Sequence, residues 1–307
     1  YQTKNQLTFP LSGPGSVGME SSFVNMVEPG DDVIVMRNGV FGGRMVENVQ
    51  RSGGRAIVID DEWGAPCDPH KLRETLQRHP SVRTVGFVHA ETSTGAESDA
   101  KTLTSIAHEF GALVICDAVT SLAGVPLLVD DWAIDAVYSG SQKCLSCVPG
   151  LSPVSYSDAV IDRVKARKDK AQVQSWFMDL NLVLDYWGET ARTYHHTAPI
   201  SMNYALHEAL RLVLEEGLEP RFERHRHAGA IDLRQDVVRK IRQRVEELHA
   251  ANTWRLGQAE AKASFTRRTL IVTSAPILSS FSRKVANSAT ASGWGFGMAS
   301  RSSSISQ

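Results

Sequence analysis

The sequence is poor in cysteine, in net charge and in long hydrophobic runs. Four cysteines in 307 residues do not make a disulfide framework and fit a reducing compartment better. The 33 basic and 34 acidic residues leave a formal net charge of −1, which gives no electrostatic case for nucleic acid or an anionic membrane as the main partner. No apolar run approaches the roughly 18–20 residues that a membrane-spanning helix needs. These shortages favour a globular chain with neither nucleic acid nor a membrane as its partner.

Few side chains are arranged to hold a metal ion. Cys144 and Cys147 have the C-x-x-C spacing of redox and metal motifs, but no second cysteine pair or His-x-x-x-His accompanies them. His195 and His196 are neighbours, and neighbouring side chains point in different directions, so they make a poor chelate. We expect no metal site, and a structural or interface role for the two histidines.

The first half of the sequence alternates between strand and helix patterns. Short apolar, β-branched runs predict buried strands at 31–36, 54–60, 82–90, 111–119 and 134–140. Amphipathic stretches predict helices at 71–78 and 103–110. Apolar strands separated by helices are typical of a largely parallel sheet with helices on both faces. In such sheets, ligands bind where the strands end.

The second half has a helical pattern from about residue 160 to 250. Apolar spacing predicts a helix at 204–216 with Gly217 as its C-cap, and a charged helix at 234–249. Residues 279–307 contain ten serines and few charges, a composition that predicts a flexible tail. The sequence opens on Tyr1 in the middle of a pattern, and we expect an N-terminal stretch to be missing.

Three local features could carry chemistry. Lys143 follows a predicted strand among small residues, where a lysine can lose its proton and form an imine with an aldehyde cofactor. Asp117 ends the strand LVICD, where a carboxylate can keep a ring nitrogen protonated. The glycine-rich turn at 12–16 precedes a helical pattern and could bind phosphate. Taken singly, Lys143 could be a surface lysine, Asp117 could cap the next turn, and the segment 12–16 could be an ordinary turn.

Together these features resemble the class V aminotransferases of fold type I, specifically the alanine/serine–glyoxylate aminotransferase group. The resemblance covers about residues 1–230. It is carried by SGPGSVGME (12–20), EPGDDVIV (28–35), NGVFGGR (38–44), HAETSTG (89–95), DAVTSLAG (117–124), YSGSQKCL (138–145), YHHTAPI (194–200) and EEGLEPRFERHR (215–226).

The resemblance implies the α/β fold of pyridoxal-phosphate-dependent transferases (aspartate aminotransferase-like), a mostly parallel sheet flanked by helices, with a truncated or aberrant C-terminal domain. We expect residues 1–200 to form a large cofactor-binding domain whose N-terminal part is missing. Residues 201–278 would be a partial C-terminal small domain, and residues 279–307 the serine-rich tail.

The resemblance also implies pyridoxal 5′-phosphate as the cofactor and a role for each matched residue. Lys143 would form the Schiff base and shuttle a proton, and Asp117 would pair with the pyridine nitrogen. The other implied cofactor contacts are Gly15, Ser16 and Gln142 at the phosphate, Thr92 at the phosphate or ring hydroxyl, and Val119 and Phe41 against the ring. Relatives often have tryptophan where this sequence has Phe41. Tyr194 and Thr197 would reach the phosphate of a neighbouring subunit's cofactor, which implies a homodimer.

Family members use a late arginine to clamp the substrate carboxylate. Arg255, in the block WRLG, is the nominal candidate. It follows the block at 215–226 too closely for the small domain expected between them, and residues 258–307 match nothing in the family.

The resemblance implies a transaminase that moves the amino group of L-serine or L-alanine to glyoxylate by a ping-pong mechanism. One alternative is another class V reaction, such as cysteine desulfuration or 2-aminoethylphosphonate transamination. Desulfurases need a cysteine on a mobile loop, a role that Cys144 and Cys147 suit badly because they adjoin the lysine. A second alternative is a cofactor-binding paralogue or gene-model fragment without turnover. We expect a cytoplasmic or peroxisomal location; the terminal SISQ is no clear peroxisomal address.

Overall fold

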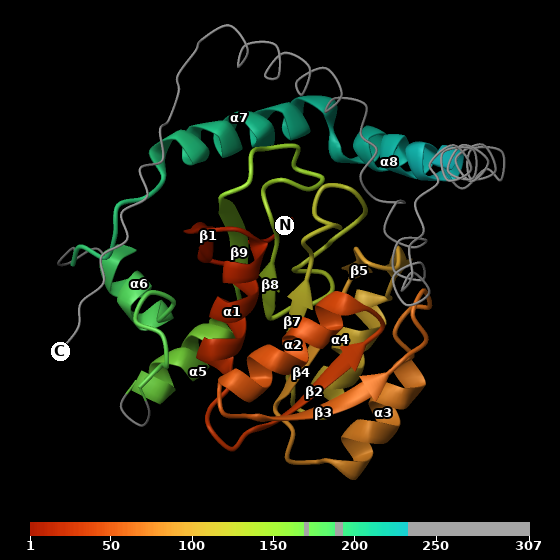
Figure 1. The fold of residues 1–307 in the computed structure, drawn as a ribbon, viewed down its shortest axis with the longest axis vertical. Helices are drawn as coiled ribbons and strands as arrows, with labels where there is room; N and C mark the ends of the chain where they lie inside the picture. The colour runs from red at the N-terminus through yellow and green to blue at the C-terminus, as the bar shows by residue number, and fades with distance from the viewer. Residues whose placement is uncertain (169–171, 188–192, 233–307) are drawn as a thin grey trace, which may run out of the picture. The chain divides into compact units, whose positions relative to one another are not determined.

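The computed structural model describes residues 1–168, 172–187 and 193–232, all within one compact unit (Figure 1). Its centre is a seven-stranded sheet with the order β1-β9-β8-β7-β4-β2-β3. The strands are β1 (Leu7–Ser12), β2 (Asp32–Arg37), β3 (Arg55–Asp60), β4 (Thr84–Val88), β7 (Leu113–Asp117), β8 (Ala136–Tyr138) and β9 (Leu151–Tyr156). Two short strands, β5 (Ala90–Glu91) and β6 (Ala96–Glu97), form a separate antiparallel pair.

The sheet is mostly parallel, as the sequence predicts. Strands β3, β2, β4, β7 and β8 run parallel, and β9 runs antiparallel to both β8 and β1. All five predicted strands are present, within about two residues of the predicted ends. Two neighbouring strands at one side of the sheet, β1 and β9, were not predicted. Each contains a proline, and Pro10 lies opposite Pro153 in their register. Proline weakens a strand pattern because it cannot donate to the ladder.

Eight helices are described. They are α1 (Gly15–Met26), α2 (Val40–Arg51), α3 (Pro69–Arg78), α4 (Ala100–Glu109), α5 (Asp158–Lys168), α6 (Leu180–Trp187), α7 (Ile200–Glu216) and α8 (Leu218–Asp232). Side-chain caps begin two of them: Asp68 accepts from the His70 N–H, and Asp99 from the Thr102 N–H. Gly217 ends α7 at φ 81°, which confirms the predicted C-cap. No helix in the described part of the chain is long and apolar enough to cross a membrane.

Some sequence predictions lie outside the described residues. These are the charged helix at 234–249, the serine-rich tail at 279–307 and the candidate substrate clamp Arg255. Helices α7 and α8 fall in the predicted partial small domain at 201–278. The domain boundaries stay predictions.

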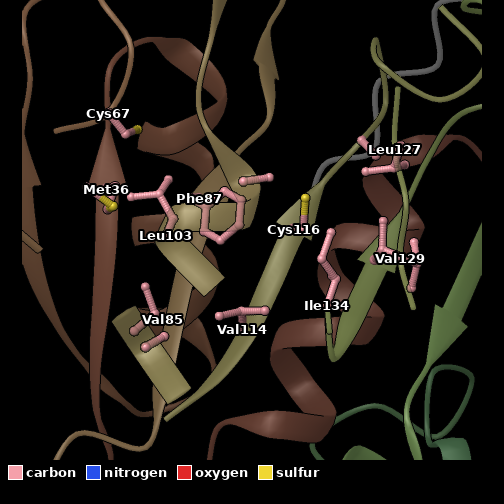
Figure 2. Close-up of a cluster of buried hydrophobic side chains, with 14 of the residues drawn as sticks. Met36, Cys67, Val85, Phe87, Leu103, Val114, Cys116, Leu127, Val129 and Ile134 are labelled. Carbon is pink, nitrogen blue, oxygen red and sulfur yellow. The ribbon is translucent and has the colours of Figure 1, made fainter. Parts of the chain in front are cut away.

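The core has two layers, one on each face of the sheet. In β2, Val33 and Val35 pack in a cluster with residues of α1, α2 and α5. Ile34 and Met36 point the other way, into a cluster with residues of α3 and α4, because successive strand side chains alternate between faces. Figure 2 shows the second cluster, with Met36, Val85 and Phe87 beside Leu103 of α4. Figure 1 shows α1 and α2 in front of the strands. This two-sided burial explains why the strands are near-continuously apolar.

Gly18 lets α1 lie directly against the sheet. A Cβ added there would lie 2.2 Å from Ser152 Oγ and 2.8 Å from Tyr138 Cβ. We expect Gly18→Ala to lower the free energy of unfolding by about 1–3 kcal/mol, since overpacking outweighs the helix propensity gained. Urea unfolding followed by circular dichroism measures this. The matched control is Gly43→Ala in α2, whose Cβ would have only Arg37 Cδ nearby, at 3.9 Å; it should be neutral or stabilising. Equal effects in both helices would contradict this account of Gly18.

Candidate active site

The predicted site residues follow the carboxyl ends of neighbouring parallel strands. Phe41 comes after β2, Thr92 after β4, Val119 after β7 and Lys143 after β8. The chain moves outward from β2 to β3 and then returns to β4 on the other side of β2. Such a switch in strand order opens a crevice at the carboxyl ends, where ligands bind in open α/β sheets. The topology therefore gathers these residues at one edge of the sheet.

The start of α1 lies against the ends of β7 and β8. A Cβ added at Gly15 would lie 3.1 Å from Val119 Cγ2 and 3.5 Å from the Ser139 carbonyl oxygen. A side chain at this position would be tight, and Val119 would have to shift by a few tenths of an ångström. The same position brings the turn at 12–16 next to the loop after β8, which carries Gln142. The structure thus brings together three segments whose shared site the sequence predicts.

The N-terminus of α1 is open to an anion. Its N-cap is Pro14, which makes no side-chain cap, and its first turn carries no acidic residue. Ser16 in that turn is exposed, and so is Gln142 nearby. Uncapped backbone N–H groups at a helix N-terminus attract phosphate. The cradle therefore fits the phosphate expected from the sequence.

Asp117 is a buried carboxyl group at the end of β7, with 2% of its surface exposed. The Val119 N–H donates to its Oδ1 at 2.8 Å, and the Tyr138 hydroxyl donates to its Oδ2 at 2.9 Å. Burial raises the pKa of Asp117 to about 7; the two donors, and the positive charge of Lys143 to a smaller degree, oppose this rise. Both of these donors are neutral, so a cationic ring nitrogen would supply a charged hydrogen-bond partner for this carboxylate. The environment of Asp117 therefore fits a pyridinium group.

The buried state of Asp117 predicts a pH-dependent stability of the cofactor-free chain. The pKa of this carboxyl is about 7 in the folded chain, against an ordinary value of 3.8. The folded state therefore keeps the proton up to a higher pH than the unfolded state. Ionisation therefore costs stability as pH rises from about 4 to 7, by roughly 1–4 kcal/mol. We expect Asp117→Asn to remove this loss and to be more stable than wild type at pH 8. Urea unfolding of both chains at pH 5, 6 and 8 measures the difference. Identical pH profiles would contradict it.

Lys143 is half-buried in a closed loop at residues 141–148, which we call the Lys143 loop. The Cys147 N–H donates to the Ser141 carbonyl at 3.0 Å, and the Ser146 N–H donates to the Lys143 carbonyl at 2.8 Å. The Cys144 thiol donates to the Thr120 carbonyl at 3.2 Å, which ties the loop to the segment after β7. Thr120 follows Asp117 by three residues, so this bond joins the segment that carries Asp117 to the loop that carries Lys143. The two residues of the central sequence prediction therefore lie in adjoining segments at the ends of β7 and β8.

Glu91 organises the side of the site that carries Phe41. It is buried, and its Oε2 accepts the backbone N–H groups of Phe41 at 3.0 Å and Gly42 at 3.3 Å. Next to it, the Thr92 hydroxyl donates to Thr120 Oγ1 at 3.3 Å. Phe41 is half-buried, with the Arg44 guanidinium carbon 4.6 Å from its ring centroid. The start of α2 and the strand β5 are therefore held together beside the loop after β7.

Tyr194 and Thr197 occupy a different place. The Tyr194 hydroxyl and Thr197 Oγ1 lie 2.8 Å apart, in the segment before α7, and Tyr194 is 69% exposed. The described hydrogen bonds join these two side chains to each other and not to Asp117 or Lys143. An outward-facing pair is the arrangement expected of residues that serve a neighbouring subunit. That role stays a prediction.

The adjacent histidines hold local structure. His196 Nε2 lies 2.7 Å from Ser12 Oγ, and the Nδ1 atoms of His195 and His196 are 2.7 Å apart. The His195 ring stacks on Trp176 with centroids 4.7 Å apart. These contacts agree with the structural role expected for the pair. In the described residues no group of three or more His, Cys, Asp or Glu side chains could hold a metal ion.

Two contributors to the site were missed by sequence reasoning. Tyr138 bonds to Asp117 because the two residues are partners in the β7–β8 register, and a register is not visible in a single sequence. Arg221 of α8 donates to the Cys144 carbonyl in the Lys143 loop. Its only signal in the sequence is the arginine-rich block at 215–226.

Known proteins match this chain over most of its length. The profile of the family described as "Aminotransferase class-V" matches residues 18–264. The (S)-ureidoglycine–glyoxylate transaminase of Bacillus subtilis is 40% identical over 247 residues, covering 75% of this chain and 59% of that protein. The alanine–glyoxylate aminotransferase of Oryctolagus cuniculus is 36% identical over 250 residues, covering 81% of this chain and 61% of that protein.

Solved structures agree. The alanine–glyoxylate aminotransferase of Nostoc sp. superposes with a TM-score of 0.70 at 40% identity, covering 81% of this chain and 63% of that one. The ureidoglycine–glyoxylate aminotransferase of Bacillus subtilis gives a TM-score of 0.71 at 40% identity, covering 75% of this chain and 58% of that one. The chain spans about three fifths of the length of these relatives.

These matches agree with the fold and with the geometry of the site. The fold is that of the pyridoxal-phosphate-dependent aminotransferases. Pyridoxal phosphate is the cofactor that the family implies, and the uncapped α1 N-terminus, the buried Asp117 and the nearby Lys143 fit it. The chain belongs to the class-V aminotransferase family.

Proposed function

We propose that the protein is a transaminase that moves the amino group of L-alanine or L-serine to glyoxylate, forming glycine and the corresponding 2-oxo acid. The observation that carries this proposal is that the loop carrying Lys143 is tied to the segment that follows buried Asp117, at the ends of β7 and β8, where the open N-terminus of α1 also lies. When bound, pyridoxal phosphate supplies an aldehyde that captures amines and a ring that withdraws electrons from the captured carbon. The two half-reactions would follow each other by a ping-pong mechanism.

The chain's own residues divide the remaining tasks. Lys143 Nζ would hold the cofactor covalently and, once released, move a proton from the α-carbon of the amino donor. Asp117 would keep a proton on the ring nitrogen, which its buried position favours once a positive charge faces it. The N–H groups around Gly15 and Ser16 would bind the phosphate. Phe41 and Val119 would orient the ring by packing against its faces.

(S)-Ureidoglycine is a second candidate for the amino donor. The Bacillus subtilis ureidoglycine–glyoxylate enzyme is 40% identical to this chain in sequence and gives a TM-score of 0.71 in structure. All three donors share a carboxylate and an α-amino group, so the described site does not discriminate among them.

A direct comparison of donors tests the proposal. The purified chain, loaded with pyridoxal phosphate, would be given glyoxylate with L-alanine, L-serine or (S)-ureidoglycine, and kcat/KM for glycine formation would be measured. The highest value with L-alanine or L-serine supports the first candidate, and the highest value with (S)-ureidoglycine supports the second. Glycine formation from none of the donors would overturn both candidates and favour a cofactor-binding protein without turnover.

We also propose that the protein works as a homodimer. Around the outward-facing Tyr194, Ile200 is 64% exposed and Tyr204 is 75% exposed, and exposed apolar surface of this kind favours contact with another chain. If the sites are shared, mixing the inactive Lys143→Ala chain with an inactive Tyr194→Ala, Thr197→Ala chain should restore part of the activity. No recovery in a mixture that forms heterodimers would contradict shared sites.

A further inference from the structure

We propose that Arg221 of α8 is a positioning residue that holds the Lys143 loop in its reactive arrangement. The inference rests on the proposed function, because the role of Lys143 is assigned there. Arg221 is distant in sequence from the segment after β7 and from the Lys143 loop, both of which it contacts. It reaches neither the cofactor cradle at α1 nor Asp117 by any described hydrogen bond.

One buried guanidinium joins three segments of the chain. Arg221 is 5% exposed, and its Nε donates to the Ala123 carbonyl at 3.0 Å. Its Nη2 donates to the Cys144 carbonyl and lies 3.4 Å from Ser146 Oγ. Its Nη1 donates to Glu216 Oε2 at 2.5 Å. The segment after β7, the Lys143 loop and the end of α7 therefore meet at one side chain.

Glu216 helps to orient the forked guanidinium group of Arg221. Hydrogen bonds from Arg224 and, to a smaller degree, from Arg221 lower the pKa of Glu216 to about 2. Glu216 therefore stays a carboxylate at neutral pH. A guanidinium is planar and offers five N–H donors in fixed directions. The bond to Glu216 therefore limits the directions in which the remaining donors reach Ala123 and Cys144.

Arg221 binds where the backbone is strained. Ala123 has φ 64° and Ser146 has φ 57°, in the left-handed region that residues other than glycine seldom adopt. Such conformations persist only where the surroundings over-determine them. Arg221 bonds to the carbonyl of Ala123 and reaches the hydroxyl of Ser146, so it is placed to hold both turns.

The Lys143 loop would be less well held without Arg221. Cys144, which follows Lys143 directly, is tied through its thiol to Thr120 and through its carbonyl to Arg221. Loss of the second tie would let the backbone at Lys143 shift. A shift of about 1 Å at a reacting group can cost on the order of 100-fold in rate. We expect kcat to fall about 10- to 100-fold in Arg221→Gln, with KM for the amino donor little changed.

The test compares three variants loaded with pyridoxal phosphate. Arg221→Gln removes the fork, and Arg221→Lys keeps the buried charge without it. Arg224→Gln is the matched control: Arg224 shares Glu216 through bonds of 2.6 and 3.0 Å, is 53% exposed at its side chain, and makes no described bond to the Lys143 loop. The readouts are kcat, the KM for the amino donor, and the pH midpoint of the near-visible band of the bound cofactor.

The expected result is a lower kcat and a shifted pH midpoint in both Arg221 variants, with Arg224→Gln like wild type. A folded Arg221→Gln or Arg221→Lys with wild-type kcat and midpoint would overturn the proposal. If Arg221→Gln does not fold, Arg221→Lys decides alone. Equal losses in the Arg224 variant would also overturn it, because the effect would then belong to Glu216. A wild-type chain with no band would instead refute the proposed function, so the two failures are distinguishable.

Discussion

Replacing Lys143 by alanine should leave the fold intact and reduce transamination by at least about 1,000-fold, since loss of a covalent catalytic group has effects of this size or larger. The bonds that close the Lys143 loop come from backbone groups of Ser141, Ser146 and Cys147, so they survive the change. The measurements are the rate of glycine formation and the thermal unfolding midpoint. Turnover within tenfold of wild type would defeat the assignment of Lys143.

A matched control separates this loss from a general effect of removing a lysine. Lys165 is exposed on α5. Lys165→Ala should retain both wild-type turnover and the near-visible band of the bound cofactor. Lys143→Ala should lose that band and still bind the cofactor weakly and reversibly, because the phosphate cradle at α1 is unchanged.

Replacing Asp117 by asparagine should produce the second large loss, about 100- to 1,000-fold in kcat. Asparagine keeps the size of the side chain but cannot hold a proton on the ring nitrogen by charge. Lys143 is untouched, so the covalent link to the cofactor should form. Rapid-mixing absorbance with L-alanine measures the rate of the first half-reaction.

The control for Asp117 is another carboxylate of the same type outside the site. Asp131 is exposed, and Asp131→Asn should behave as wild type in the same experiment. A folded Asp117→Asn chain with an unchanged first half-reaction would contradict the pairing of Asp117 with the ring nitrogen.

The parallel part of the fold could be predicted because its main signal, a short apolar run for each buried strand, is local and repeats along the sequence. The runs at 31–36 and 111–119 are apolar enough to be buried on both faces, and the structure buries them so. Strands β1 and β9 could not be predicted because Pro10 and Pro153 weaken their pattern. Their pairing comes from residues more than a hundred positions apart, which no local window contains.

The site could be predicted where its residues sit at strand ends. Asp117 and Lys143 each follow an apolar run, so their shared edge follows from the parallel topology. The bond from Tyr138 depends on register, and Arg221 meets the Lys143 loop across 77 positions of sequence. Strand register and the position of α8 relative to the Lys143 loop set these contacts, and periodicity specifies neither. Sequence reasoning therefore found the groups assigned to the chemistry and missed groups that hold them in place.

The most direct test of the account is reductive trapping of the cofactor. The purified chain would be incubated with pyridoxal phosphate, reduced with borohydride, digested and analysed by mass spectrometry. The account predicts a reduced cofactor adduct on the peptide containing Lys143, and its loss when L-alanine is added before the reductant. An adduct mainly on another lysine, or none under conditions where the chain is folded, would contradict the assignment of Lys143 as the residue that holds the cofactor.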